Sequence, residues 1–172
     1  MFRFLFALAL LPAFPADALE QFVFDSIDGG QYDTDAWRGR PILVVNTASL
    51  CGFTEQYAAL QTLHERYADE GLVVLAVPSD DFEQELGSNA EIKEFCELNY
   101  GLTMPMTVMT PVTGDDAHPF YAWLRDDHGF RPRWNFNKVL IAPDGAVVAT
   151  YGSTVPPTAP RITRQIDAML SR

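Results

Sequence analysis

The chain of 172 residues has little positive charge and few cysteines. It carries 12 lysines and arginines against 23 acidic residues, for a formal net charge of −11, and its only lysines are Lys93 and Lys138. Nucleic acids and anionic membranes bind clustered basic side chains, so this composition argues against both as partners. The two cysteines, Cys51 and Cys96, form no C-x-x-C pair, and the three histidines add no zinc-binding spacing. No metal site is therefore expected.

The chain also lacks an apolar run long enough to span a bilayer. The run Phe4–Phe14 would extend about 16 Å as a helix, and a bilayer core is about 30 Å thick. Arg3 precedes this run and Ala16-Asp17-Ala18 follows it, which is the order of a secretory signal peptide. We expect a signal peptide over 1–18 and an exported mature domain over 19–172, periplasmic in a bacterium and otherwise secreted. An uncleaved anchor or a buried helix is the alternative.

The remaining sequence is rich enough in apolar residues to form one domain. Hydrophobic residues make up 48% of the chain, and a domain near 150 residues buries about 68–70% of its unfolded surface. Continuous apolar runs over 41–46 and 72–77 predict strands that are buried on both faces. Apolar residues recur at helical spacing over 53–67, between the two runs. This order predicts a right-handed βαβ unit.

Turn and cap signals define the other elements. Alternation over 21–27 followed by Asp28-Gly29-Gly30 predicts an N-terminal hairpin. Ser88 and Glu91 form a capping box that begins a helix ending near Gly101. We expect a thioredoxin-like α/β fold, with a central mixed β-sheet flanked by helices and an N-terminal β-hairpin. Its last elements are a helix over 119–127, strands over 136–142 and 146–151, and a helix over 160–170.

Cys51 lies between the first buried strand and the following helix, where open α/β sheets place their sites. The free N–H groups at the start of a helix favour a thiolate, which is the nucleophilic form of cysteine. A reactive cysteine is the favoured interpretation, and a buried inert one is the alternative. In an exported protein, Cys51 and Cys96 are either a structural disulfide or a redox-active pair.

Trp134 and Asn135 precede the strand predicted over 136–142, so they could face Cys51 at the same edge of the sheet. Their N–H groups are neutral donors that can stabilise a thiolate or a leaving oxygen without titrating. A packing tryptophan and a turn asparagine are the simpler interpretation of the spacing alone.

Several motifs, in order along the chain, resemble the glutathione peroxidase family. The resemblance runs from about residue 20 to the C-terminus, and its segments together are highly specific. They are Asn46-Thr47-Ala48-Ser49-Leu50-Cys51-Gly52-Phe53-Thr54, Leu72–Pro78 with Phe82, Phe95-Cys96 with Asn99-Tyr100-Gly101, Ala117-His118-Pro119, and Trp134-Asn135-Phe136 with Lys138.

This resemblance implies a thiol peroxidase on a thioredoxin-like fold. Cys51 matches the peroxidatic position, which is selenocysteine in some relatives, and Trp134 and Asn135 match two polar active-site residues. Cys96 matches the resolving cysteine of members that use a thioredoxin-like reductant. The chain also lacks the insertion that tetrameric relatives carry before the Trp-Asn motif, which favours a monomer or dimer.

The chain departs from the family pattern in one loop. Asp80-Asp81 stands where the family has Asn-Gln, and a carboxylate at Asp81 can only accept hydrogen bonds. Its charge would disfavour a thiolate nearby. Asp81 must be protonated, turned away or replaced by another donor. The following Glu83-Gln84-Glu85-Leu86-Gly87 is one residue shorter than the family segment and lacks its proline.

Three functions are compatible with these observations. The leading hypothesis is an antioxidant enzyme that reduces hydrogen peroxide and organic hydroperoxides, with a thioredoxin-like protein or glutathione as the reductant. This chemistry needs no bound cofactor. The second is a thiol–disulfide oxidoreductase or redox sensor without efficient peroxidase turnover. The third is a non-enzymatic domain that is stabilised by a Cys51–Cys96 disulfide.

Overall fold

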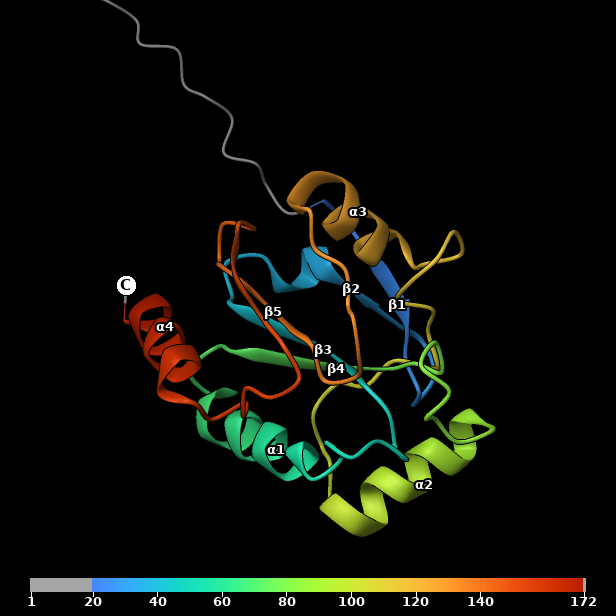
Figure 1. The fold of residues 1–172 in the computed structure, drawn as a ribbon. Helices are drawn as coiled ribbons and strands as arrows, with labels where there is room; N and C mark the ends of the chain where they lie inside the picture. The colour runs from blue at the N-terminus through green and yellow to red at the C-terminus, as the bar shows by residue number, and fades with distance from the viewer. Residues whose placement is uncertain (1–19, 172) are drawn as a thin grey trace, which may run out of the picture.

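A four-stranded mixed sheet lies at the centre of the computed structural model, which describes residues 20–171 (Figure 1). The predicted signal peptide, 1–18, lies outside the described residues. The strand order is β4-β3-β5-β6, in which β3 and β4 are parallel and the other neighbours are antiparallel. The strands are β3 (Ile42–Thr47), β4 (Val73–Pro78), β5 (Lys138–Ile141) and β6 (Val147–Tyr151).

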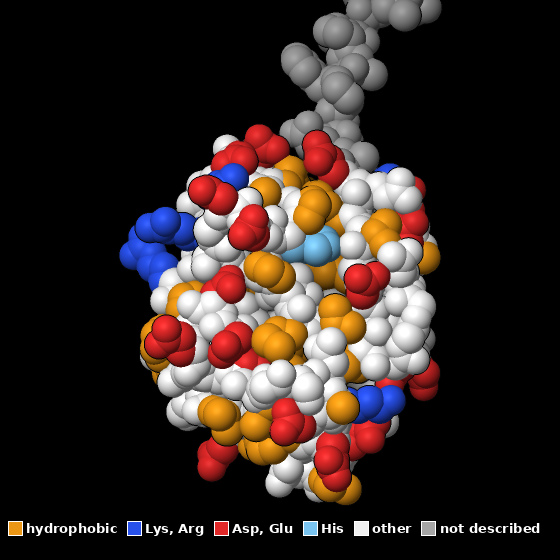
Figure 2. Space-filling model, turned by 90° about the vertical axis from the view of Figure 1, so that its right-hand side faces the viewer, with side chains coloured by type: hydrophobic (Ala, Val, Ile, Leu, Met, Phe, Trp, Pro, Cys, Tyr) orange, Lys and Arg blue, Asp and Glu red, His pale blue; other side chains and the backbone are white. Residues whose placement is uncertain are grey.

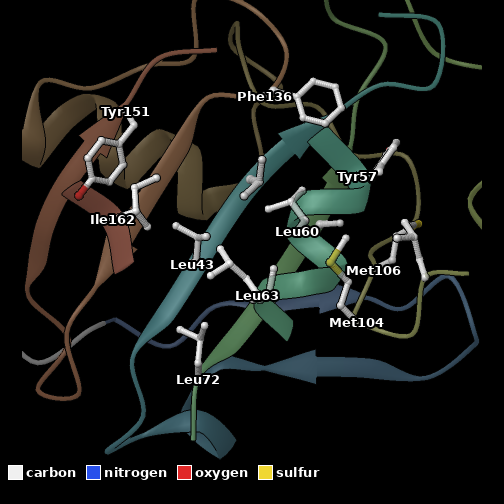
Figure 3. Packing of buried hydrophobic residues seen from close by; sticks show 14 of the residues in the cluster. Leu43, Tyr57, Leu60, Leu63, Leu72, Met104, Met106, Phe136, Tyr151 and Ile162 are labelled. Atoms are coloured by element: carbon white, nitrogen blue, oxygen red, sulfur yellow. The ribbon is translucent and has the colours of Figure 1, made fainter. Parts of the chain in front are cut away.

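Side chains alternate between the two faces of this sheet, and each face has its own core. On one face the core includes residues of α1 (Gln56–Tyr67), α2 (Asn89–Tyr100) and α4 (Pro160–Leu170). Leu43 on β3 belongs to this core, and Figure 3 shows it beside Leu60 and Leu63 of α1.

The other face of the sheet is covered by α3 (Pro119–His128) and the N-terminal hairpin of β1 (Val23–Asp25) and β2 (Gln31–Asp33) (Figure 1). Phe24 of the hairpin packs on Phe120 of α3 with ring centroids 5.8 Å apart. The thioredoxin-like fold predicted from the sequence is confirmed, including its mixed sheet and its hairpin.

Local signals in the sequence set the ends of α2. The Ser88 hydroxyl accepts a hydrogen bond from the Glu91 N–H at 3.3 Å, as the capping box predicts. Gly101 ends the helix in the left-handed region at φ 59°, where a residue without a Cβ is favoured. A one-turn 3₁₀ helix, Thr34–Trp37, was not predicted.

The strand predicted over 136–142 is shorter than expected. β5 begins at Lys138, because Phe136 adopts a left-handed conformation at φ 59°. The N–H of Phe136 donates to the Asn46 carbonyl at 2.6 Å, and its ring is fully buried. Tertiary packing therefore holds a conformation that an aromatic residue rarely adopts alone.

No helix among residues 20–171 is long and apolar enough to cross a membrane. Within the same residues, no group of three or more histidines, cysteines or carboxylates could hold a metal ion.

Candidate active site

Cys51 lies in the loop that joins the end of β3 to α1. Cys51 is only 6% exposed, and its sulfur accepts a hydrogen bond from the Phe53 N–H at 3.4 Å. The loop continues through hydrogen-bonded turns directly into α1, because the Thr54 N–H donates to the Cys51 carbonyl at 3.1 Å. A backbone donor aimed at the sulfur stabilises the thiolate form.

Thr54 occupies the position that a second cysteine has in a C-x-x-C motif. Its hydroxyl lies within hydrogen-bonding distance of the carbonyls of Ala48, Ser49 and Cys51. The side chain therefore stabilises the loop around Cys51. The local sequence cannot form a C-x-x-C disulfide.

The start of β5 lies beside the end of β3, as expected from the order of elements. Val45 pairs with Lys138 in the antiparallel register, and the Asn46 side-chain amide donates to the Trp134 carbonyl at 3.0 Å. Residues 134 and 135 are thus held close to the start of the Cys51 loop.

Trp134 and Asn135 make different contacts at this edge. Trp134 is 41% exposed, and its ring lies 5.5 Å from the Phe82 ring. Asn135 is fully buried, and its amide donates to the side-chain oxygen of Gln84 at 3.2 Å. Among residues 20–171 no hydrogen bond joins either side chain to the Cys51 sulfur. A direct role for the two residues therefore stays a prediction.

The Asp81 carboxylate is directed to another part of the molecule. One of its oxygens accepts from the backbone N–H groups of Val112 and Thr113, both at 2.7 Å, and from the Thr113 hydroxyl at 3.0 Å. Of the three possibilities raised by the sequence, these contacts favour a side chain turned away from Cys51. They give Asp81 a structural role in anchoring the segment at Val112.

Gln84 and Glu85 were not singled out by sequence reasoning, yet both contact the Cys51 loop. The Gln84 carbonyl accepts from the Leu50 N–H at 2.9 Å. A Glu85 carboxylate oxygen accepts from the Ser49 N–H, also at 2.9 Å. Glu85 is buried, and burial raises the pKa of its carboxyl above the ordinary value. The feature of the sequence that could have drawn attention to them is the loop they belong to, which is one residue shorter than the corresponding family segment.

Cys96 lies within α2 and is 1% exposed. Burial raises the pKa of its thiol to about 12. Cys51 and Cys96 are both free thiols and belong to the same hydrophobic core. The structure therefore has the disulfide-free form of both cysteines.

The sheet order and the helices on its two faces define a thioredoxin-like fold, with Cys51 in the loop after the central strand β3. A thiol:disulfide interchange protein of the thioredoxin family from Chlorobium tepidum shares the fold, with a TM-score of 0.68 at 15% identity, over 93% of this chain and 99% of that one.

More similar proteins define the family. A family model described as glutathione peroxidase matches residues 19–125. A Synechocystis protein named hydroperoxy fatty acid reductase gpx1 is 39% identical over 160 residues, which are 87% of this chain and 94% of that protein. The crystal structure of Trgpx in apo form has a TM-score of 0.70 at 31% identity, over 90% of this chain and 97% of that chain. The chain belongs to the glutathione peroxidase family and is a peroxidase-type oxidoreductase.

Proposed function

We propose that this enzyme reduces hydrogen peroxide and organic hydroperoxides through a two-cysteine cycle. The Cys51 thiolate attacks the O–O bond, takes up one oxygen as a sulfenic acid, and releases water or an alcohol once the leaving oxygen is protonated. The Cys96 sulfur then attacks the Cys51 sulfur, so that an S–S bond replaces the S–O bond and water leaves. The observation that carries the proposal is the hydrogen bond that the Phe53 N–H donates to the sulfur of Cys51, a free cysteine in the loop after β3.

The surface charge supports a dithiol protein of the thioredoxin type as the preferred reductant. Figure 2 shows acidic side chains spread over one face of the molecule, with few basic ones. Glutathione carries net negative charge, so a protein of charge −11 attracts it poorly. Arg131 and Arg133 line a cleft of about 550 Å³ together with Phe82, and their positive charges partly offset this repulsion. A second thiol in the same chain also captures a sulfenic acid at high effective concentration.

Peroxide turnover with rival reductants tests this proposal. Hydrogen peroxide consumption by the purified protein is measured with thioredoxin and with glutathione, each coupled to NADPH oxidation. We expect faster turnover with thioredoxin and none in Cys51→Ser, because a serine hydroxyl supplies almost no anion near neutral pH. Retention of most of the rate in Cys51→Ser would overturn the assignment of the nucleophile. Normal thioredoxin-dependent turnover in Cys96→Ser would overturn the two-cysteine cycle.

The two alternative functions would give different results in assays of the same purified protein. A thiol–disulfide oxidoreductase would reduce insulin without consuming peroxide, and the lack of a C-x-x-C motif at Thr54 disfavours it. A non-enzymatic domain would instead contain a Cys51–Cys96 disulfide that resists mild reductant, and it would consume no peroxide.

We also propose that the enzyme is exported, because residues 1–18 have the pattern of a secretory signal peptide. Expression of the full chain in a bacterium, followed by fractionation and N-terminal sequencing, is expected to give a periplasmic protein that begins near Leu19. A cytoplasmic protein that retains Met1 would contradict export.

A further inference from the structure

The turn that carries Trp134 and Asn135, directly before β5, is held in place by side chains. The carbonyls of three successive residues, Trp134, Asn135 and Phe136, each accept a hydrogen bond from a side chain, at distances of 2.6–3.0 Å. The donors are Asn46 of β3, Asn137, Lys138 of β5, and Ser153, which follows β6. Backbone carbonyls pair mostly with backbone N–H groups, so this concentration of side-chain donors indicates a segment whose position is closely fixed.

The same turn contains a strained residue. Phe136 has a left-handed backbone at φ 59°, which a residue with a bulky side chain keeps only where its surroundings impose it. Its ring is fully buried and packs edge-on against Tyr57 of α1, with ring centroids 5.4 Å apart (Figure 3). Backbone strain of this kind is common at functional sites, and here it directly follows Asn135.

Ser153 joins this turn to the segment of Cys51. Its hydroxyl donates to the Asn135 carbonyl at 2.6 Å and accepts from the side-chain amide of Asn137 at 3.0 Å. The Ser153 carbonyl accepts from the side-chain amide of Gln56, also at 2.6 Å. Gln56 is the first residue of α1, the helix that the Cys51 loop enters. Ser153 therefore links the backbone of Asn135 to the helix that follows Cys51.

The side chain of Asn135 makes little use of its own bonding capacity. Its Nδ2 donates to Gln84 at 3.2 Å, and its Oδ1 is buried without a partner among residues 20–171. A side-chain amide has two N–H donors and an oxygen that can accept twice, so one bond leaves both donor and acceptor capacity free. One bond also fixes the side chain only weakly. The position of this amide therefore depends on the backbone of Asn135, which Ser153 holds.

We propose that Ser153 is a positioning residue for the reduction of peroxide. Its hydroxyl fixes the Asn135 backbone, so that the free N–H of the Asn135 amide can donate to the Cys51 thiolate or to the leaving oxygen of the peroxide. Its carbonyl, through Gln56, keeps this point in a constant relation to α1. Ser153 acts only through Asn135. The inference rests on the proposed function, since it concerns the oxidation of Cys51.

Two substitutions separate the hydroxyl from the rest of the residue. Ser153→Ala removes the hydroxyl and keeps the carbonyl that binds Gln56, whereas Ser153→Thr keeps both. Ser26→Ala is the matched control, because the Ser26 hydroxyl accepts the Asp28 N–H at 3.2 Å in the N-terminal hairpin, on the other face of the sheet. The measurement is kcat/KM for hydrogen peroxide with a saturating dithiol reductant. In a ping-pong cycle this ratio depends only on the steps up to the oxidation of Cys51.

We expect Ser153→Ala to lower kcat/KM about tenfold, since a misplacement of about 1 Å in an active site can cost about a hundredfold. Ser153→Thr and Ser26→Ala should retain the rate. In an Asn135→Ala background, which is itself slow, Ser153→Ala should cause no further loss, because the amide that it positions is gone. A merely structural role of Ser153 would lower the rate by the same factor in both backgrounds.

Urea denaturation measures the folded fraction of each variant, and rates are expressed per folded protein. The proposal is overturned if Ser153→Ala or Asn135→Ala keeps the normal rate. It is also overturned if Ser153→Thr is as slow as Ser153→Ala, or if the two alanine substitutions have additive effects. A different result would contradict the proposed function itself, namely an unmodified protein that consumes no peroxide or a Cys51→Ser variant that still consumes it.

Discussion

The Asn135 amide donates a hydrogen bond to the Gln84 side-chain oxygen at 3.2 Å, which links the start of β5 to the loop before α2. The same Gln84 accepts the Leu50 N–H through its carbonyl, directly before Cys51 in the sequence. One residue thus contacts both segments that carry the predicted active-site side chains. Asp81, at the position of the family glutamine, contacts neither through a hydrogen bond.

Gln84→Met is expected to slow peroxide reduction about fivefold, because loss of one hydrogen bond of about 1 kcal/mol lets Asn135 leave its position. The measurement is kcat/KM for hydrogen peroxide with a saturating reductant. Gln31→Met, which removes an exposed bond to Asp25, is the control and should leave the rate unchanged. An unchanged rate in Gln84→Met would show that Gln84 does not position Asn135.

Asp81→Ala is expected to reduce stability without changing the reactivity of Cys51. It removes the acceptor of two backbone N–H groups, including that of the buried Val112, and should lower the free energy of unfolding by about 1–3 kcal/mol. Urea denaturation measures this loss, and iodoacetamide alkylation measures reactivity. A several-fold change in the alkylation rate of Cys51 would instead show that the carboxylate acts on the sulfur.

Oxidation is expected to loosen α2. Cys96 is buried in the middle of this helix, so bonding to Cys51 requires local unwinding. After one equivalent of peroxide, amide hydrogen exchange should rise over residues 88–101, while β3 and β4 remain protected. Cys96→Ser should show no such rise. An equal rise in that variant would mean that the disulfide is not its cause.

Lys138 should make the protein less stable as the pH falls from about 10 to about 7. Burial lowers the pKa of this amine to about 7, so over that range the unfolded chain binds more protons than the folded protein. The free energy of unfolding should therefore rise with pH at up to about 1.4 kcal/mol per pH unit.

Urea denaturation at several pH values measures this slope. Lys138→Met should remove it, although the variant loses the bond from the ammonium group to the Phe136 carbonyl. Lys93 is exposed and paired with Asp28, so Lys93→Met is the control that should keep the slope. A slope that persists in Lys138→Met would assign it to other groups.

The regular elements could be predicted from the sequence because their causes are local. The apolar run at 41–46 matches β3, and the Ser88 capping box and Gly101 mark the ends of α2 as observed. The order of these elements was enough to place Cys51 at the end of a central strand. The motifs around Cys51 and Trp134 also resembled the family to which the chain belongs.

Burial and long-range partners were decided only by the tertiary structure. The charged side chains of Glu85 and Lys138 look ordinary in the sequence, yet packing buries both and shifts their pKa values. The direction of Asp81 depends on Val112, which lies 31 positions further along the chain. The left-handed turn at Phe136 likewise depends on its bond to Asn46. The periodicity of apolar residues predicts which face of a helix or strand is buried. The charge state and hydrogen-bond partners of a polar side chain depend on segments that are distant in the sequence and come close only on folding.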